Sequence, residues 1–267
     1  MKFRRSNSRA PTWYWEKYWK ICITQIINLY QHKSNESDDS HICSYISDTP
    51  THGSKGRYIF SDKFDESERI KRKHFVIKYI FEGNFSAPVK DLLTNGCRVL
   101  DIVLEYTQSS FVGLDIFNMF PSEIKPNNTD FILADVRNNL PFESNYFDYI
   151  HLGCRRILKP GGWIEFQEIQ HSMNNPGPCS EKFSSLANKW TNSKEIRTSP
   201  YSPNDLKKIP NITNINKIVK QIPLGSWGGK LGEEYEESLS VLLFYIAEPI
   251  AKMHNCPPEE INELINI

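Results

Sequence analysis

The chain has 267 residues, of which 39% are hydrophobic, and its 32 basic side chains balance its 32 acidic ones. This length suits one large domain with appendages, and a balanced charge gives no global reason to expect a nucleic-acid partner. The six cysteines form no C-x-x-C pair, so they predict reduced thiols rather than a disulfide framework. No run of 18 apolar residues is present, so no transmembrane segment is expected. We therefore expect a cytoplasmic or nuclear protein.

Residues 1–56 have the composition of an N-terminal extension. A basic, polar start leads into the aromatic-rich stretch Trp13–Tyr30, and a linker rich in Ser, Asn, Asp and His follows over 31–56. We interpret 1–56 as partly disordered, with one aromatic-rich helix. That helix either docks on the domain, stays a poorly ordered extension, or lies on a membrane surface. Its charged residues, and the lack of a small-residue cleavage site after it, argue against a signal peptide.

Residues 57–267 are predicted to form the main domain, in which helix and strand patterns alternate. A helix is expected from Ser61 or Asp62 up to Gly83, and a second, short helix over 88–94. Apolar runs then predict strands at 97–102, 111–116, 131–136, 146–152 and 163–169, with a helical remnant at 155–159. Further helices are expected at 183–192, 202–208 and 233–253, and one more strand at 215–222.

This order of elements predicts an α/β fold. We expect a Rossmann-like, doubly wound and mostly parallel sheet in the core 97–170, with a helical C-terminal part over 180–267. Three of the strands end in an acid, namely Asp101, Asp115 and Asp135. In open α/β sheets, ligands bind at the carboxyl ends of the strands. That edge is therefore the expected binding site.

Several short motifs occur in a characteristic order between residues 61 and 265. They are Asn84-Phe85-Ser86-Ala87-Pro88-Val89, Val99-Leu100-Asp101, Gly113-Leu114-Asp115-Ile116, Ala134-Asp135-Val136, Phe147-Asp148-Tyr149-Ile150-His151 and Arg156-Ile157-Leu158-Lys159-Pro160-Gly161-Gly162-Trp163. In this order and spacing, the segment resembles the class I S-adenosylmethionine-dependent methyltransferases. It is most similar to a subfamily of small eukaryotic enzymes that includes regulators of secondary metabolism.

The resemblance implies S-adenosyl-L-methionine as cofactor and methyl transfer to an unidentified acceptor. It implies that Asp115 accepts hydrogen bonds from both ribose hydroxyls, for which the two oxygens of a carboxylate are suited. It likewise implies that Asp135 accepts from the adenine amine, that Val136 donates its backbone amide, and that Ile116 packs on the ring. Asp101 would lie near the methionine end. The alternative for each acid is that it caps a neighbouring loop.

The chain departs from the family at two places. No glycine follows Asp101, and only the eight residues 103–110 separate the first two strands, whereas a parallel crossover normally takes ~10–12 residues or more. The helix expected after the fourth strand is also missing between Leu152 and Arg156. These gaps indicate excised segments, lost either in evolution or in the gene model. The alternative function is therefore a non-catalytic, methyltransferase-like binding or regulatory protein, and a truncated, poorly folding chain is the third interpretation.

The sequence assigns no catalytic residue. His151, Glu168 and His171 lie near the carboxyl edge and could act as bases, His171 being the best placed, although a loop histidine without a catalytic role is the favoured interpretation of it. His151 and Cys154 are three residues apart, but no further ligands cluster with them, so no metal site is expected. The acceptor remains open between a small molecule, a lipid and a protein, and a protein partner is compatible with the sequence.

Overall fold

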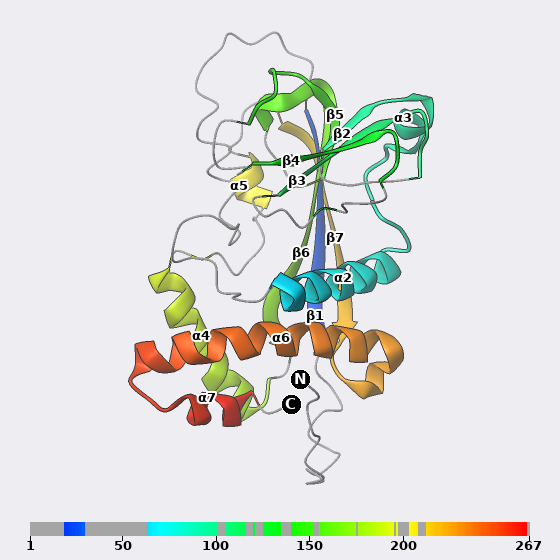
Figure 1. Ribbon diagram of the computed structural model, residues 1–267. Helices are drawn as coiled ribbons and strands as arrows, with labels where there is room; N and C mark the ends of the chain where they lie inside the picture. Colours follow the sequence, from blue (N-terminus) through cyan, green and yellow to red (C-terminus); the bar gives the residue numbers. More distant parts are fainter. Residues whose placement is uncertain are drawn as a thin grey trace.

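The computed structural model describes residues 19–29, 63–100, 105–115, 120, 125–134, 140–151, 155–174, 176–194, 196, 203–207 and 212–265. Within them, seven strands form one sheet in the order β4-β3-β2-β5-β6-β1-β7 (Figure 1). Five neighbouring strands are parallel: β4 (Thr129–Leu133), β3 (Ser110–Asp115), β2 (Arg98–Leu100), β5 (Phe147–His151) and β6 (Leu158–Asn174). Helices flank this sheet, so the predicted Rossmann-like α/β class is confirmed.

The strand order reverses between β2 and β5. From β2 the chain adds β3 and then β4 on one side, and it adds β5 and then β6 on the other. Numbered by their order in the chain, the five parallel strands therefore lie as 3-2-1-4-5, which is the arrangement of doubly wound folds. Each of the five overlaps a predicted strand, although β6 is much longer than the expected 163–169.

The expectation of a helix within Trp13–Tyr30 is wrong for residues 19–29. This segment is strand β1 (Trp19–Leu29), which pairs antiparallel with β6 on one side and with β7 (Ile212–Pro223) on the other. β1 is therefore an internal strand of the main sheet and not part of a separate extension. The physical reason is pairing on both sides, which satisfies its backbone groups and outweighs the weak helical spacing of its apolar residues.

The described parts of two crossovers carry no α-helix, as the short spacings predicted. Between β2 and β3, residues 105–109 form a turn that ends at the buried Ser109. The Ser109 hydroxyl donates to the Leu93 carbonyl oxygen at 2.6 Å and accepts from the Cys97 amide at 3.1 Å. Between β5 and β6, the expected helical remnant is a single 3-10 turn, Arg155–Ile157.

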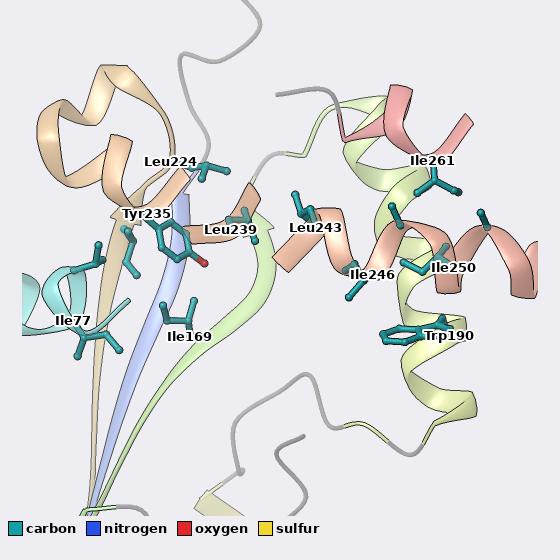
Figure 2. Close-up of a cluster of buried hydrophobic side chains, with 14 residues drawn as sticks. Ile77, Ile169, Trp190, Leu224, Tyr235, Leu239, Leu243, Ile246, Ile250 and Ile261 are labelled. Carbon is teal, nitrogen blue, oxygen red and sulfur yellow. The ribbon is translucent and has the colours of Figure 1, made fainter. Parts of the chain in front are cut away.

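Four helices pack together at one end of the sheet: α2 (Lys63–Ile80), α4 (Pro178–Ser193), α6 (Gly229–His254) and α7 (Pro258–Leu264). Figure 2 shows Tyr235 and Leu239 of α6 beside the long strands, with Leu243 of α6, Trp190 of α4 and Ile261 of α7 further along the same cluster. Two short helices, α3 (Lys90–Asn95) and α5 (Pro203–Lys207), lie next to the sheet. The sequence predicted all of these helices except α7.

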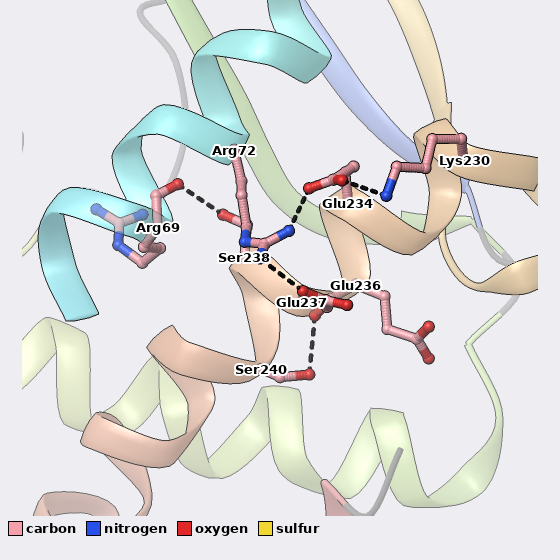
Figure 3. Close-up of polar contacts among 8 residues, drawn as sticks. All are labelled: Arg69, Arg72, Lys230, Glu234, Glu236, Glu237, Ser238 and Ser240. Carbon is pink, nitrogen blue, oxygen red and sulfur yellow. Dashed lines mark hydrogen bonds and ion pairs between the residues drawn. The ribbon is translucent and has the colours of Figure 1, made fainter. Parts of the chain in front are cut away.

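Polar contacts join α2 to α6 within this layer (Figure 3). Arg72 of α2 pairs with two carboxylates of α6, Glu234 and, at 2.9 Å, Glu237. Ser238 donates from its hydroxyl to the Arg69 carbonyl oxygen at 3.1 Å. Lys230 also pairs with Glu234, and this hydrogen bond lowers the pKa of the Glu234 carboxyl. None of the described helices is long and apolar enough to cross a lipid bilayer.

Candidate functional site

Asp115 stands where the sequence placed it, at the carboxyl end of β3. It pairs with Leu133 of β4, and its carbonyl oxygen accepts from the Ala134 amide at 2.8 Å. Its side chain is half-buried. By strand alternation it shares a face of the sheet with Phe111. The remaining predicted site residues, Asp101, Ile116, Asp135 and Val136, lie outside the described residues.

Asp115 and His151 flank the point where the strand order reverses. Leu100, the last residue of β2, pairs with Val112 on one side and Ile150 on the other. β3 and β5 both continue beyond that level, to Asp115 and His151. Two strand spacings, together with an offset of two residues along the strands, put their Cα atoms roughly 12 Å apart. Phe111 and Tyr149 belong to one buried cluster, so alternation places Asp115 and His151 on the same face as that cluster.

An aromatic pair lies beside Asp115. Phe131 of β4 pairs with Gly113, and a Cβ added at Gly113 would sit 2.6 Å from a ring carbon of Phe131. Only a glycine at this position lets the ring lie across β3. Phe120 stacks on Phe131 with ring centroids 4.8 Å apart. A carboxylate next to apolar ring surface can hold a sugar hydroxyl and a flat heterocycle together.

A buried hydrogen-bond network lies on the same face of the sheet as Asp115 and His151. It is centred on β6, the strand next to β5. The Glu165 carboxylate of β6, fully buried, accepts from the Ser86 amide at 2.8 and 3.0 Å and from the Ala87 amide at 2.9 Å. The Tyr149 hydroxyl donates to it at 2.9 Å and the Gln167 side-chain amide at 3.0 Å. Glu165 thereby fixes the segment before α3 against the sheet.

Two pKa shifts mark this network. Burial, followed by the charge and hydrogen bond of Glu165, raises the pKa of Tyr149 well above its ordinary value, so the phenol stays a donor at neutral pH. Burial also lowers the pKa of His151, which keeps its imidazole neutral. The Glu165 charge and the Gln167 side chain act in the opposite direction and raise the pKa of His151, but burial has the larger effect. The Nε2 atom of that ring is buried and has no hydrogen-bond partner among the described residues.

The other candidate bases are less favourably placed. Glu168 of β6 is half-buried and, by alternation, lies on the face opposite Glu165. The side chain of His171 and the whole of Cys154 lie outside the described residues. No group of three or more metal-ligating side chains occurs in the described part of the chain.

Sequence reasoning missed Glu165 and Gln167. The signal was an acid placed between two apolar residues, Ile164 and Phe166, on a predicted strand. A charged residue on a buried strand must be fully hydrogen-bonded, and here its backbone donors, Ser86 and Ala87, come from a segment about 80 residues earlier, which no local pattern reveals. A scan of protein-family models, a search of curated proteins and a search of solved structures each found no match for this chain.

Proposed function

We propose that the carboxyl edge of the parallel sheet binds the nucleoside part of S-adenosyl-L-methionine, and that the protein is a methyltransferase acting on an acceptor not yet identified. The observation that carries the proposal is the position of Asp115, at the end of β3 and beside the reversal of strand order between β2 and β5. Ligands of doubly wound sheets bind at that point. The family resemblance of the motifs around Asp115 supports the same cofactor.

The described residues fit the nucleoside end of this cofactor. The Asp115 carboxylate has two oxygens for two neighbouring ribose hydroxyls, and the stacked Phe120 and Phe131 supply an apolar surface next to it. When bound, the cofactor supplies an electrophilic methyl group on a sulfonium. The protein then needs mainly to hold an acceptor nucleophile in line with that methyl group.

A second function, cofactor binding without turnover, is favoured by the short connection between β2 and β3. The described part of this connection is held in place by hydrogen bonds. The side-chain amide of Asn128 donates to the carbonyl oxygens of Tyr106 at 3.0 Å and Ser109 at 2.7 Å. A turn anchored in this way leaves little chain for a loop around the methionine end. Ribose binding at Asp115 does not depend on that loop, so the two functions share one binding test.

Binding is tested on the full chain by calorimetry and thermal shift with S-adenosylhomocysteine. If the dissociation constant is about 100 µM, 10 mM ligand should stabilise the fold by about 2.7 kcal/mol. Asp115→Ala should abolish the shift, measured against the ligand-free melting temperature of the same variant. The matched control is Asp130→Ala, which removes an exposed acid of β4 near the opposite edge and should bind as wild type does.

The outcomes separate the interpretations. No stabilisation of the wild-type chain would overturn the proposal. Equal stabilisation of wild type and Asp115→Ala would show that the ribose lies elsewhere. If the ligand binds but no methyl group reaches phenol, amine or thiol acceptors from S-adenosylmethionine, the non-catalytic function is the better one.

A further inference from the structure

Helix α2 carries apolar side chains on two opposite faces. Its inner face contributes Val76 and Ile77 to the buried cluster shared with α6. Its outer face carries three aromatic side chains, Phe64, Phe75 and Tyr79, which are 71%, 46% and 65% exposed. Single exposed apolar side chains are common on proteins, but several on one helix face indicate an interaction surface.

The outer face has the residue spacing of a helix-packing seam. Four residues succeed one another along it at intervals of four, three and four positions: Phe64, Glu68, Lys71 and Phe75. At this spacing they lie within roughly 60° of the helix circumference. Glu68 and Lys71 form an exposed ion pair at 2.7 Å, which keeps both charged groups on this face. The seam therefore has two opposite charges at its centre and an aromatic ring beyond each of them.

This seam is complementary to a second copy of itself. We consider two antiparallel α2 helices related by a two-fold axis at the midpoint of Glu68 and Lys71. Phe64 then stands level with the partner's Phe75, and Glu68 stands level with the partner's Lys71. The axis repeats both contacts, so two ring pairs flank four charges of alternating sign. A parallel pair in register would instead set Glu68 against the partner's Glu68, which repulsion disfavours.

The size of the exposed surface sets the expected affinity. The exposed parts of the three rings amount to roughly 300 Å² per protomer. With the charged side chains between them, a pair of protomers would bury on the order of 1,000 Å², at the lower limit for a specific interface. We therefore expect a dimer with a dissociation constant of about 1–100 µM. An anionic membrane is a less suitable occupant, because Glu68 lies in the middle of the face and would be repelled.

We propose that the protein forms a two-fold homodimer through the outer faces of its α2 helices. Phe64 packs against the partner's Phe75, and Glu68 pairs with the partner's Lys71. This inference goes beyond the proposed function and does not depend on it, since it uses no residue of the cofactor site.

Charge reversal tests the register of the two helices. In sedimentation equilibrium of the full chain up to about 200 µM, the average mass should rise from 31.1 kDa towards twice that value. Glu68→Lys sets lysines against each other across the axis, and Lys71→Glu sets acids against each other. Each should weaken the dimer at least about tenfold. The double variant Glu68→Lys/Lys71→Glu restores opposite charges and should dimerise within about threefold of wild type. All three should keep their melting temperature within about 2 °C, because both side chains are exposed.

A second pair of variants tests the rings. Phe75→Ser removes one ring of each aromatic pair and should weaken the dimer at least about tenfold. The matched control is Leu133→Ser, which removes a 60% exposed apolar side chain from β4, the sheet edge opposite β7. It should dimerise as wild type does.

The outcomes decide between the possible occupants of this face. A wild-type chain that stays monomeric at about 200 µM would overturn the inference. A dimer that survives both single charge reversals uses another surface, and a double variant as weak as the single ones contradicts the antiparallel register; either result overturns the inference. If a monomeric wild-type chain sediments with phosphatidylserine vesicles and Phe75→Ser does not, the face binds a membrane and not a second copy.

Discussion

Glu165 accepts more hydrogen bonds than any other side chain described at the candidate site. Glu165→Gln keeps the shape but puts an NH₂ group where backbone and phenol donors already point, so donors face donors. We expect the free energy of unfolding to fall by about 2–3 kcal/mol, measured by urea denaturation at pH 7. The control Glu143→Gln changes an exposed acid and should cost less than about 0.5 kcal/mol. Equal losses would mean that the network adds nothing to stability.

The lowered pKa of His151 predicts a loss of stability on mild acidification. The unfolded chain has a histidine pKa of about 6.5, so below that pH it binds a proton that the folded His151 does not. Stability should therefore fall as the pH drops from about 6.5 towards the folded pKa, and be fully present above 6.5. His74 is shifted in the same direction, by burial and by Lys78.

Urea unfolding at pH 7.5 and 5.5 measures this effect. His151→Gln should reduce the difference in unfolding free energy between the two pH values, and His74→Gln should also reduce it, in part because the charge of His74 contributes to the lowered pKa of His151. A wild-type difference that neither substitution changes would show that carboxyl groups, and not these two rings, cause it. The pH range stays above the ordinary pKa values of the acids to keep that contribution small.

At the residue scale, the sequence predicted what depends on local order and missed what depends on distant contacts. Asp115 at the end of β3 followed from an apolar run that stops at an acid, and the structure confirms that position. The link from Ser86 to Glu165 joins residues 79 positions apart. Whether Asp115 binds a ribose stays a prediction.

At the scale of elements, the start of α6 depends on close backbone packing. Gly232 lies against the turn before the helix, and a Cβ there would come within 2.1 Å of the Gly225 carbonyl oxygen. Because backbone cannot move aside as a side chain can, Gly232→Ala should lower the free energy of unfolding by about 1–3 kcal/mol. Chemical denaturation would measure the loss.

Gly83→Ala is the matched control for this prediction. Gly83 follows α2, and the nearest atom to an added Cβ is the Phe85 carbonyl oxygen at 3.7 Å, an ordinary contact. Gly83→Ala should therefore lower the free energy of unfolding by well under 1 kcal/mol. If Gly232→Ala proves equally mild, the N-terminal end of α6 can shift and the layer of helices is less rigid than the packing indicates.

The elements that the sequence predicted well have strong local signals. Helix α6 has a long apolar stripe, and β7 and the five parallel strands are rich in Ile, Val, Leu and aromatic residues between polar turns. Residues 19–29 contain isoleucines at spacings that suit a strand or a helix. Only the two partner strands, more than 130 residues away, decide between them, and no local pattern contains that information.

At the scale of the whole molecule, the sheet consists of two parts that differ in how their strands are connected and in what packs against them. The strands from β4 to β5 are joined by short connections, whereas the long strands β6, β1 and β7 extend to the helical layer of α2, α4, α6 and α7 (Figure 1). The proposed site lies where these two parts meet, since Asp115 belongs to the first and Glu165 with Gln167 to the second. Substitutions that destabilise the long strands should therefore also disturb the site.

β1 provides the test of that connection. Thr24 lies in the middle of the strand and pairs with Gln167 of β6 and Ile218 of β7. Thr24→Pro removes a backbone donor from an internal strand and leaves a partner unsatisfied, so the free energy of unfolding should fall by about 2 kcal/mol or more. For a domain of this size that lowers the melting temperature by about 4–8 °C. Thr24→Val keeps the backbone donor and the branched side chain and should stay within about 2 °C of wild type. If both variants melt with wild type, residues 19–29 are a dispensable extension, and β6 does not depend on them.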